Sequence, residues 1–392
     1  MLSPLELAAG LPLPIGRGFL PIERSTLTPR TALDHAILPA LRRGPCVVSF
    51  SGGCDSSLVL AAAVQAARRH GLPMPVPLTV RVRGDAASDE REWQELVVRH
   101  LRLSEWIRLE VGEELDCVGE LAQSVLLRHG VLWPANAHFH EPQLEQAAGG
   151  SLVTGIGGDE IFGRSGWQPL QLVLARRAQP VPRDALRLAA ALAPVALRAR
   201  VAARRAELEL DWLQPEARRE VVAALARGAA SEPIGWRRRF EWVVGSRPLR
   251  LGPASLDLLG RHHGVLVRHP LLDPGFVASL ASLPGSARFT SRNAALETLF
   301  PDLLPAPLVA RRTKAVFTAP LWGEASRAFA AEWDGSGVDP SLVAVETLLR
   351  RWRVEQKPGP FTLLQSLWLL SVRTSAGDDA EQLLDSLVEA RP

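Results

Sequence analysis

Short apolar runs alternate with longer helix-like stretches through the first 165 residues of the chain. The apolar runs predict four strands, at residues 46–50, 76–82, 105–109 and 151–154. The periodicity between them predicts helices at residues 56–70, 89–100 and 114–129. Strands that alternate with helices at this spacing indicate an α/β fold with a doubly wound parallel sheet.

The pattern changes on either side of this region. Beyond about Gly163 the strand signals fade, and amphipathic helical segments broken by prolines follow. Residues 1–45 are rich in prolines and turn residues around one predicted helix at 32–42. We therefore expect an N-terminal extension at 1–45, an α/β core at 46–165 and a mainly helical part at 166–392.

Composition narrows the class of protein. The 392 residues are 47% apolar and 22% charged, which is typical of a globular chain and excludes a disordered or collagen-like one. The 45 basic and 42 acidic residues give a net charge of only +3, so nucleic acid is not the expected partner. An arginine-rich stretch at 183–250 is interpreted as solvated helix faces, in preference to a landing surface for an acidic peptide or RNA.

The setting is expected to be cytoplasmic. No apolar run reaches the ~18 residues of a membrane helix, and the N-terminus lacks the pattern of a signal peptide, so no membrane partner is expected. The three cysteines, Cys46, Cys54 and Cys117, show neither CxxC nor zinc-ligand spacing. This favours a reducing compartment and no structural zinc.

The strongest chemical signal is Ser-Gly-Gly-Cys-Asp-Ser-Ser at residues 51–57, between a predicted strand and a predicted helix. Gly52 and Gly53 permit close approach of an anion, and helix-start amides with the Ser51 and Ser56 hydroxyls suit a polyphosphate. Asp55 is a candidate Mg²⁺ ligand, since that ion prefers one or two carboxylates together with phosphate oxygens. The alternative is that Asp55 and Ser56 merely cap the helix.

A second glycine-rich segment, Thr-Gly-Ile-Gly-Gly-Asp-Glu-Ile-Phe-Gly at residues 154–163, follows the last predicted strand. It is not a dinucleotide fingerprint, because Glu160 occupies the last glycine position. Loops after parallel strands meet at the carboxyl edge of the sheet. We therefore expect Asp55 and Asp159 to approach one another and share a Mg²⁺–pyrophosphate, although a plain helix start at Asp159 remains the alternative.

These two motifs resemble the synthetase domain of the asparagine synthetase family, within the PP-loop ATP pyrophosphatases. A third stretch agrees with that family's order: Arg-His-Pro-Leu-Leu-Asp at 268–273, then Leu-Leu-Pro at 303–305 and the run from Arg311 to Leu321. The resemblance covers residues 46–372 and implies attack of a carboxylate on ATP. An acyl-adenylate and pyrophosphate would form, and an amine would then displace AMP to give an amide.

The resemblance also assigns roles to individual residues. Ser51, Gly52, Gly53, Asp55 and Ser56 would bind the phosphates of ATP and Mg²⁺. Thr154 and Gly155 would contact the adenosine through their backbone, Val80 would line the adenine pocket, and Asp159 would supply the second metal carboxylate. Lys314, one of only two lysines, falls at the family's lysine position and would stabilise charge on the α-phosphate.

Departures from the family pattern narrow the reaction. Residue 2 is Leu2, where the glutamine-dependent members carry the nucleophilic cysteine, so no glutaminase activity is expected. Ile156 replaces the acid of asparagine-forming members and the tyrosine of β-lactam-forming ones. The chain resembles the macrolactam cyclases of lasso-peptide pathways, which implies a precursor peptide that supplies a carboxylate and an amine, and a pathway protease.

Several alternatives stay open: an ammonia-dependent asparagine synthetase, a PP-loop enzyme that modifies tRNA, and an inactive scaffold that binds a peptide. The group that deprotonates the amine is also open. Candidates by chemistry alone are Asp273, Glu160, His138, His140, His262 and His263.

Overall fold

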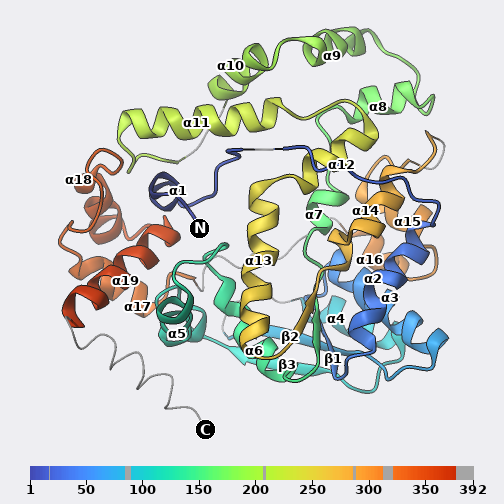
Figure 1. Ribbon diagram of the computed structural model, residues 1–392, viewed down its shortest axis with the longest axis horizontal. Helices are drawn as coiled ribbons and strands as arrows, with labels where there is room; N and C mark the ends of the chain where they lie inside the picture. Colours follow the sequence, from blue (N-terminus) through green and yellow to red (C-terminus); the bar gives the residue numbers. More distant parts are fainter. Residues whose placement is uncertain (17, 84–89, 206–208, 286–287, 312–320, 377–392) are drawn as a thin grey trace.

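A computed structural model gives the fold of the chain (Figure 1). It describes residues 1–16, 18–83, 90–205, 209–285, 288–311 and 321–376. Lys314 lies outside the described residues.

A five-stranded parallel sheet forms the centre of the α/β part. The strands are β1 (Cys46–Ser49), β2 (Val76–Val82), β3 (Ile107–Val111), β4 (Ser151–Val153) and β5 (Leu266–Arg268). They lie in the order β3-β2-β1-β4-β5, and every neighbouring pair is parallel. Because β1 is central, the loops that follow β1 and β4 lie side by side at the carboxyl edge.

Helices cover both faces of this sheet, so the expected doubly wound α/β fold is confirmed (Figure 1). Val48 of β1 belongs to one buried cluster with the helices α2 (Pro29–Leu41) and α3 (Cys54–His70). Its neighbour Val47 belongs to the opposite cluster, with α6 (Glu141–Gln146) and α13 (Arg247–His262). Alternate side chains of a strand point to opposite faces, which is why one apolar run serves two cores.

The remaining helices of the first part are α1 (Pro4–Ala9), α4 (Arg91–Leu101), α5 (Glu120–His129) and α7 (Gly158–Ile161). Those of the later part are α8 (Gln168–Leu174), α9 (Pro182–Leu192), α10 (Val195–Arg205), α11 (Pro215–Ala230), α12 (Trp236–Val244), α14 (Pro274–Ala281), α15 (Arg292–Leu299), α16 (Ala306–Ala310), α17 (Glu324–Glu332), α18 (Val345–Leu349) and α19 (Phe361–Ala376). Short 3₁₀ turns lie at Glu113–Leu115, Ala137–His140 and Pro270–Leu272, and a π-helical turn at Arg350–Val354.

Three sequence predictions need correction. The strand expected at 105–109 lies at Ile107–Val111, and the helix expected at 114–129 starts only at Glu120. The fading of strand signals beyond Gly163 was misleading, because Leu266–Arg268 forms the fifth strand. Three residues between a helix and a 3₁₀ turn are too short to show a period, and their pairing with β4 decides their conformation.

A second apolar core lies away from the sheet, in the helical part. It joins α1, α11, α17 and α19 around buried tryptophans such as Trp352. Helix α1 thus packs into the helical part, whereas α2 packs against α3. The boundaries expected at residues 45 and 165 stay predictions.

Within the described ranges, no helix combines the length and apolar character needed to cross a membrane.

Candidate nucleotide-binding and active site

The first loop of the site turns directly from β1 into α3. Gly52 has φ +88°, a left-handed conformation that glycine adopts without strain. Helix α3 begins at Cys54, its N-cap is Gly53, and no side chain caps it. The alternative that Asp55 and Ser56 serve as helix caps is therefore wrong, and the positive end of the helix dipole stays open toward an anion.

Two serine hydroxyls hold this loop in shape. Ser51 Oγ and Ser56 Oγ lie 3.1 Å apart, and Ser51 Oγ accepts a hydrogen bond of 3.3 Å from the Gly53 amide. Ser56 Oγ also donates to the Gly53 carbonyl at 3.1 Å. The hydroxyls expected to bind phosphate thus lie together at the helix start.

The second loop, which follows β4, packs backbone to backbone on the first. A Cβ at Gly158 would collide with the carboxylate of Asp55, and one at Gly155 would lie 2.8 Å from the Ser56 amide nitrogen. Gly157 has φ +95° and places α7 at this position. Glycine is needed here because any larger side chain would separate the two loops.

This packing brings Asp55 and Asp159 together around one cation, Arg292. The Arg292 guanidinium pairs closely with Asp55 and lies 3.0 Å from Asp159 Oδ1. Burial by itself lowers the pKa of Arg292, but the charges of Asp55 and Asp159 outweigh it and raise that pKa above its usual value. Two carboxylates from distant segments therefore converge on a single positive group, as expected from the sheet topology.

Arg292 was not among the residues expected at the site, although its position in the sequence indicates a charged partner. It is the first residue of α15, whose N-cap is Ser291. A cation at a helix N-terminus opposes the helix dipole, so an arginine there indicates a partner elsewhere. The two aspartates are that partner.

Arg239 fixes the far side of the second loop and was also missed. It is almost fully buried, and its guanidinium donates to the carbonyls of Glu160 at 3.2 Å and Gly163 at 2.7 Å. Desolvation by burial lowers its pKa, and the charge of Glu232 partly offsets this. One arginine of the basic stretch at 183–250 is thus a loop anchor, which the interpretation as solvated faces did not foresee.

The donor chemistry of the site fits Mg²⁺. Asp55 and Asp159 supply two carboxylates that already share one cation, and the Ser51 and Ser56 hydroxyls lie beside Asp55. Among the described residues there is no cluster of three or more His, Cys, Asp or Glu that would form an all-protein cage. Mg²⁺ characteristically takes one or two carboxylates and completes its shell with phosphate oxygens and water.

The residues expected to contact adenosine lie on β2 and directly after β4. Val80 is half-buried on β2, and Val80 and Ile156 both pack against the same apolar cluster. Thr154 is buried, and its Oγ1 lies 2.7 Å from His269 Nδ1. Their roles toward adenosine stay predictions.

A buried ion pair fixes Arg311, which stands three residues before Lys314 in the sequence. Arg311 pairs with Glu90 through both guanidinium nitrogens, both side chains are less than a tenth exposed, and the guanidinium lies 4.9 Å from the Trp93 ring. The Cβ of Glu90 would lie 3.4 Å from a Cβ placed on Gly52. The chain is thus fixed beside the phosphate loop three residues before Lys314.

Most candidates for the general base have structural partners. Asp273 caps α14 by accepting from the Gly275 and Phe276 amides, and His263 Nε2 lies 2.9 Å from Glu141. Burial lowers the pKa of His138 to about 4 and also lowers that of His140. The His262 ring packs edge-on against His129 and His263, and Glu160 stands next to Asp159. The geometry leaves the base unassigned.

Comparison with known families gives one match. The sequence model described as asparagine synthase matches residues 30–359, which is most of the chain and includes both loops, Arg292 and Lys314. No curated protein sequence matches the chain.

Proposed function

Because the chain belongs to the asparagine synthase family and is therefore an ATP-dependent, amide-forming synthetase, we propose that it activates its carboxylate substrate as an acyl-adenylate. A carboxylate oxygen attacks the α-phosphorus of ATP, and pyrophosphate leaves. The substrate amine then attacks the acyl carbon, loses a proton, and displaces AMP. The products are an amide, AMP and pyrophosphate.

One observation carries this proposal: Asp55 and Asp159 converge on one cation beside the uncapped start of α3. Such a site suits a nucleotide triphosphate with its metal, because the helix amides and hydroxyls face anions and the carboxylates face a cation. Mg²⁺, held by Asp55 and Asp159, would neutralise charge on the phosphates when bound. The glycines at 155 and 158 keep the two carboxylates within reach of each other.

Lys314 is the residue that we propose stabilises the α-phosphate in this reaction. The anchored Arg311 lies three residues before it, and three residues span at most about 10 Å. An ammonium near the α-phosphate would stabilise the charge that develops there during adenylation.

For the substrate, we propose a peptide whose carboxylate and amine are joined in a macrolactam, with no glutamine hydrolysis. The resemblance to the lasso-peptide cyclases supports a peptide. A cavity of about 830 Å³ next to the second loop also supports it, since ammonia needs only a small fraction of that volume.

The proposal is tested by exchange of radiolabelled pyrophosphate into ATP. The carboxylate probes are L-aspartate and peptides with an internal Asp or Glu. We expect substrate-dependent exchange that Asp55→Asn abolishes, with glutamate release from glutamine absent. Exchange by a peptide but not by aspartate supports the cyclase. An absence of exchange with every probe, in a protein that still binds ATP, would identify a scaffold instead.

A further inference from the structure

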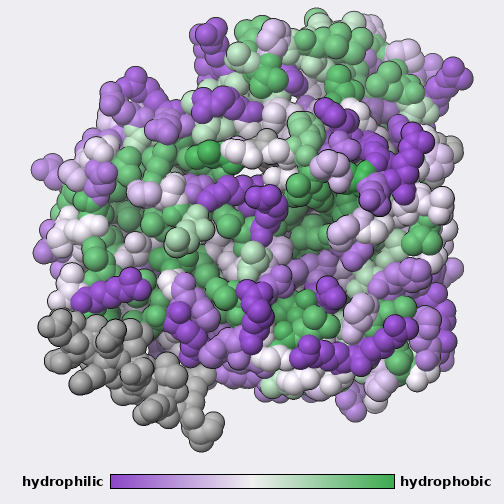
Figure 2. All heavy atoms as spheres, viewed as in Figure 1, coloured by the Kyte–Doolittle hydropathy of each residue, from purple (hydrophilic) through white to green (hydrophobic). Residues whose placement is uncertain are grey.

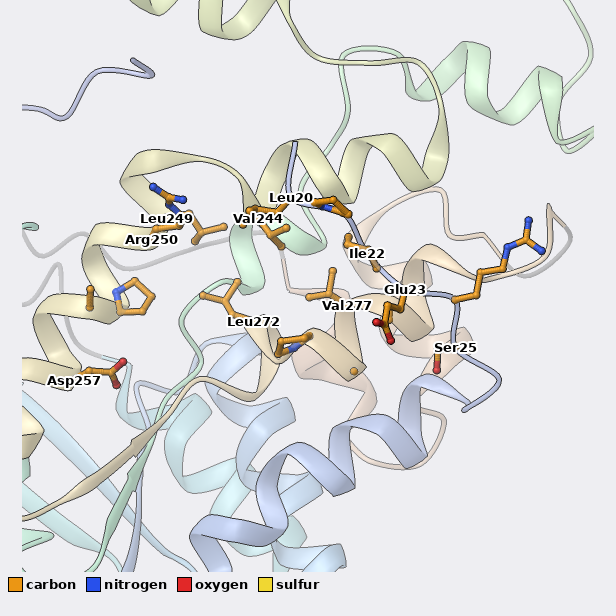
Figure 3. Close-up of a pocket in the computed structure, with 17 residues that line it drawn as sticks. Leu20, Ile22, Glu23, Ser25, Val244, Leu249, Arg250, Asp257, Leu272 and Val277 are labelled. Atoms are coloured by element: carbon orange, nitrogen blue, oxygen red, sulfur yellow. The ribbon is translucent and has the colours of Figure 1, made fainter. Parts of the chain in front are cut away.

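A large, mainly apolar cavity lies between the N-terminal segment and the helices on either side of β5 in the sequence (Figure 3). Residues 20–25 form one wall, and α13 and α14 form the others. Its volume is about 830 Å³. Apolar side chains make up most of the lining, and the largest of them are Leu20, Ile22, Val244, Leu249, Leu272 and Val277.

The cavity adjoins the second loop of the nucleotide site in two ways. Leu272, which lines the cavity, packs so closely on Gly157 that a Cβ there would collide with it. Asp257 also lines the cavity, and its Oδ1 lies 3.8 Å from His269 Nε2, while His269 Nδ1 contacts Thr154. A molecule in the cavity would therefore lie next to the loop that carries Asp159.

The second ring nitrogen of His269 is buried and makes no well-formed hydrogen bond. The ring is more than nine-tenths buried, and its Nε2 forms no hydrogen bond within the described structure. Burial lowers the pKa of His269 to about 4, which the nearby Pro253 carbonyl only partly offsets, so the ring is neutral at pH 7. Buried polar atoms usually have a partner, and an orphan therefore points to a ligand.

The spacing of His269 and Asp257 suits one small cation. If Nδ1 carries the proton and donates it to Thr154 Oγ1, Nε2 is left with a free lone pair. Two acceptors 3.8 Å apart can both accept from one ammonium group, each at about 2.9 Å. Burial raises the pKa of Asp257 despite the positive charges of Arg261 and Arg268, so its carboxylate gains from a cation that approaches from the cavity.

We propose that this cavity binds the amine substrate as a primary ammonium carried on a bulky apolar group, with the ammonium held between Asp257 and His269 Nε2. The inference rests on the proposed function, because it assigns the amine of that reaction. The apolar walls account for the bulky group, and the Asp257 carboxylate in the lining, with the buried His269 Nε2 3.8 Å from it, accounts for the charge. Ammonia, by contrast, has no apolar group that could contact the walls of the cavity.

Direct binding tests the proposal with small probes, by calorimetry on the full chain. We expect L-leucinamide to bind at least tenfold more tightly than glycinamide, which lacks the apolar group, and than N-acetyl-L-leucinamide, which lacks the charge. Asp257→Asn should weaken leucinamide binding at least tenfold. The matched control Glu120→Gln, which removes an exposed carboxylate at the start of α5 and outside the cavity lining, should change it less than twofold.

A second variant tests the cavity without removing a charge. Ala254 lines the cavity and is exposed, so Ala254→Trp fills the space without disturbing the core, and it should abolish leucinamide binding while ATP binding stays. Equal affinity for the acetylated probe, or no saturable binding of leucinamide, would overturn the amine assignment. Pyrophosphate exchange does not use the amine, so exchange without leucinamide binding refutes only this inference. Leucinamide binding without exchange refutes the adenylation proposal instead.

Discussion

At the scale of single residues, the site is a balance of charge between Asp55, Asp159 and Arg292. The arginine neutralises two carboxylates that would otherwise repel each other across the two loops. A metal that uses the same carboxylates must compete with this guanidinium. Arg292 therefore sets the affinity of the pair for a divalent cation.

Replacing Arg292 should change the metal requirement. In Arg292→Gln the competing charge is gone, and we expect the Mg²⁺ concentration for half-maximal pyrophosphate exchange to fall several-fold. The measurement is a Mg²⁺ titration of the exchange rate, with Arg219→Gln as the control because that arginine is exposed and pairs only with Glu216 among the contacts described. An unchanged or higher Mg²⁺ requirement in Arg292→Gln would contradict the competition.

The two lysines of the chain provide a matched pair. We expect Lys314→Ala to lower the exchange rate about 10²–10³-fold, the loss typical when one charge-stabilising donor is removed. Lys357→Ala should leave the rate unchanged, because Lys357 is half exposed and pairs with Glu355. Thermal unfolding of both variants checks the fold, and full activity of Lys314→Ala would remove this residue from the mechanism.

At the scale of elements, α9 exposes large apolar side chains. Leu186 and Leu192 are both more than 70% exposed, and on α9 only Asp184 and Ala191 are buried. Apolar residues appear at the top edge in Figure 2, where Figure 1 places α9 and α10. An amphipathic helix of a globular protein usually packs its apolar side on a core, yet the leucines of α9 face outward.

This exposure makes the leucines of α9 dispensable for stability. The double variant Leu186→Glu/Leu192→Glu should change the free energy of unfolding by no more than about 0.5 kcal/mol per site, the usual range for surface substitutions. By contrast, Leu60→Ala on the fully buried face of α3 should cost about 2–5 kcal/mol. Urea denaturation measures both, and a large loss in the α9 variant would mean that these leucines are covered in solution.

At the scale of the whole molecule, buried histidines make the free energy of unfolding depend on pH. Burial lowers the pKa of both His138 and His269 to about 4, whereas an exposed histidine titrates near 6.5. Below pH 6.5 the unfolded chain therefore binds more protons at these residues than the folded chain does. Stability contributed by the neutral rings is complete above pH 6.5 and is lost progressively as the pH falls toward 4.

We expect the free energy of unfolding to drop by about 2 kcal/mol per buried histidine between pH 6.5 and pH 5. Urea denaturation at the two pH values measures the drop. His269→Gln should have a shallower pH dependence, and His35→Gln should keep the full one because His35 is exposed. Equal slopes in all three proteins would show that the His269 ring does not titrate as its burial requires.

Local sequence was enough to predict the phosphate loop and the strands around it. Residues 46–57 combine an apolar run, two glycines and a helical period, and the structure follows that order. Local sequence did not predict the strand at Leu266–Arg268, because its three residues form a strand only through their pairing with β4. Local sequence also did not predict the role of Arg239. For Arg292 it offers only the position at a helix start, which indicates a partner without identifying it, because folding decides which groups an arginine meets.

The amino-acid sequence by itself determined the parallel α/β core, its family and the two glycine-rich loops, because these depend on local periodicity and on glycines at fixed positions. Only the tertiary structure decided that Arg292 joins Asp55 to Asp159, that Arg239 anchors the second loop, and that Asp257 meets His269 at the end of a cavity. The physical reason is sequence distance. The contacts of Arg292 and Arg239 join residues 76 or more positions apart, and the Asp257–His269 contact joins a helix to the end of the strand that follows it. Such contacts exist only when packing closes the intervening segments.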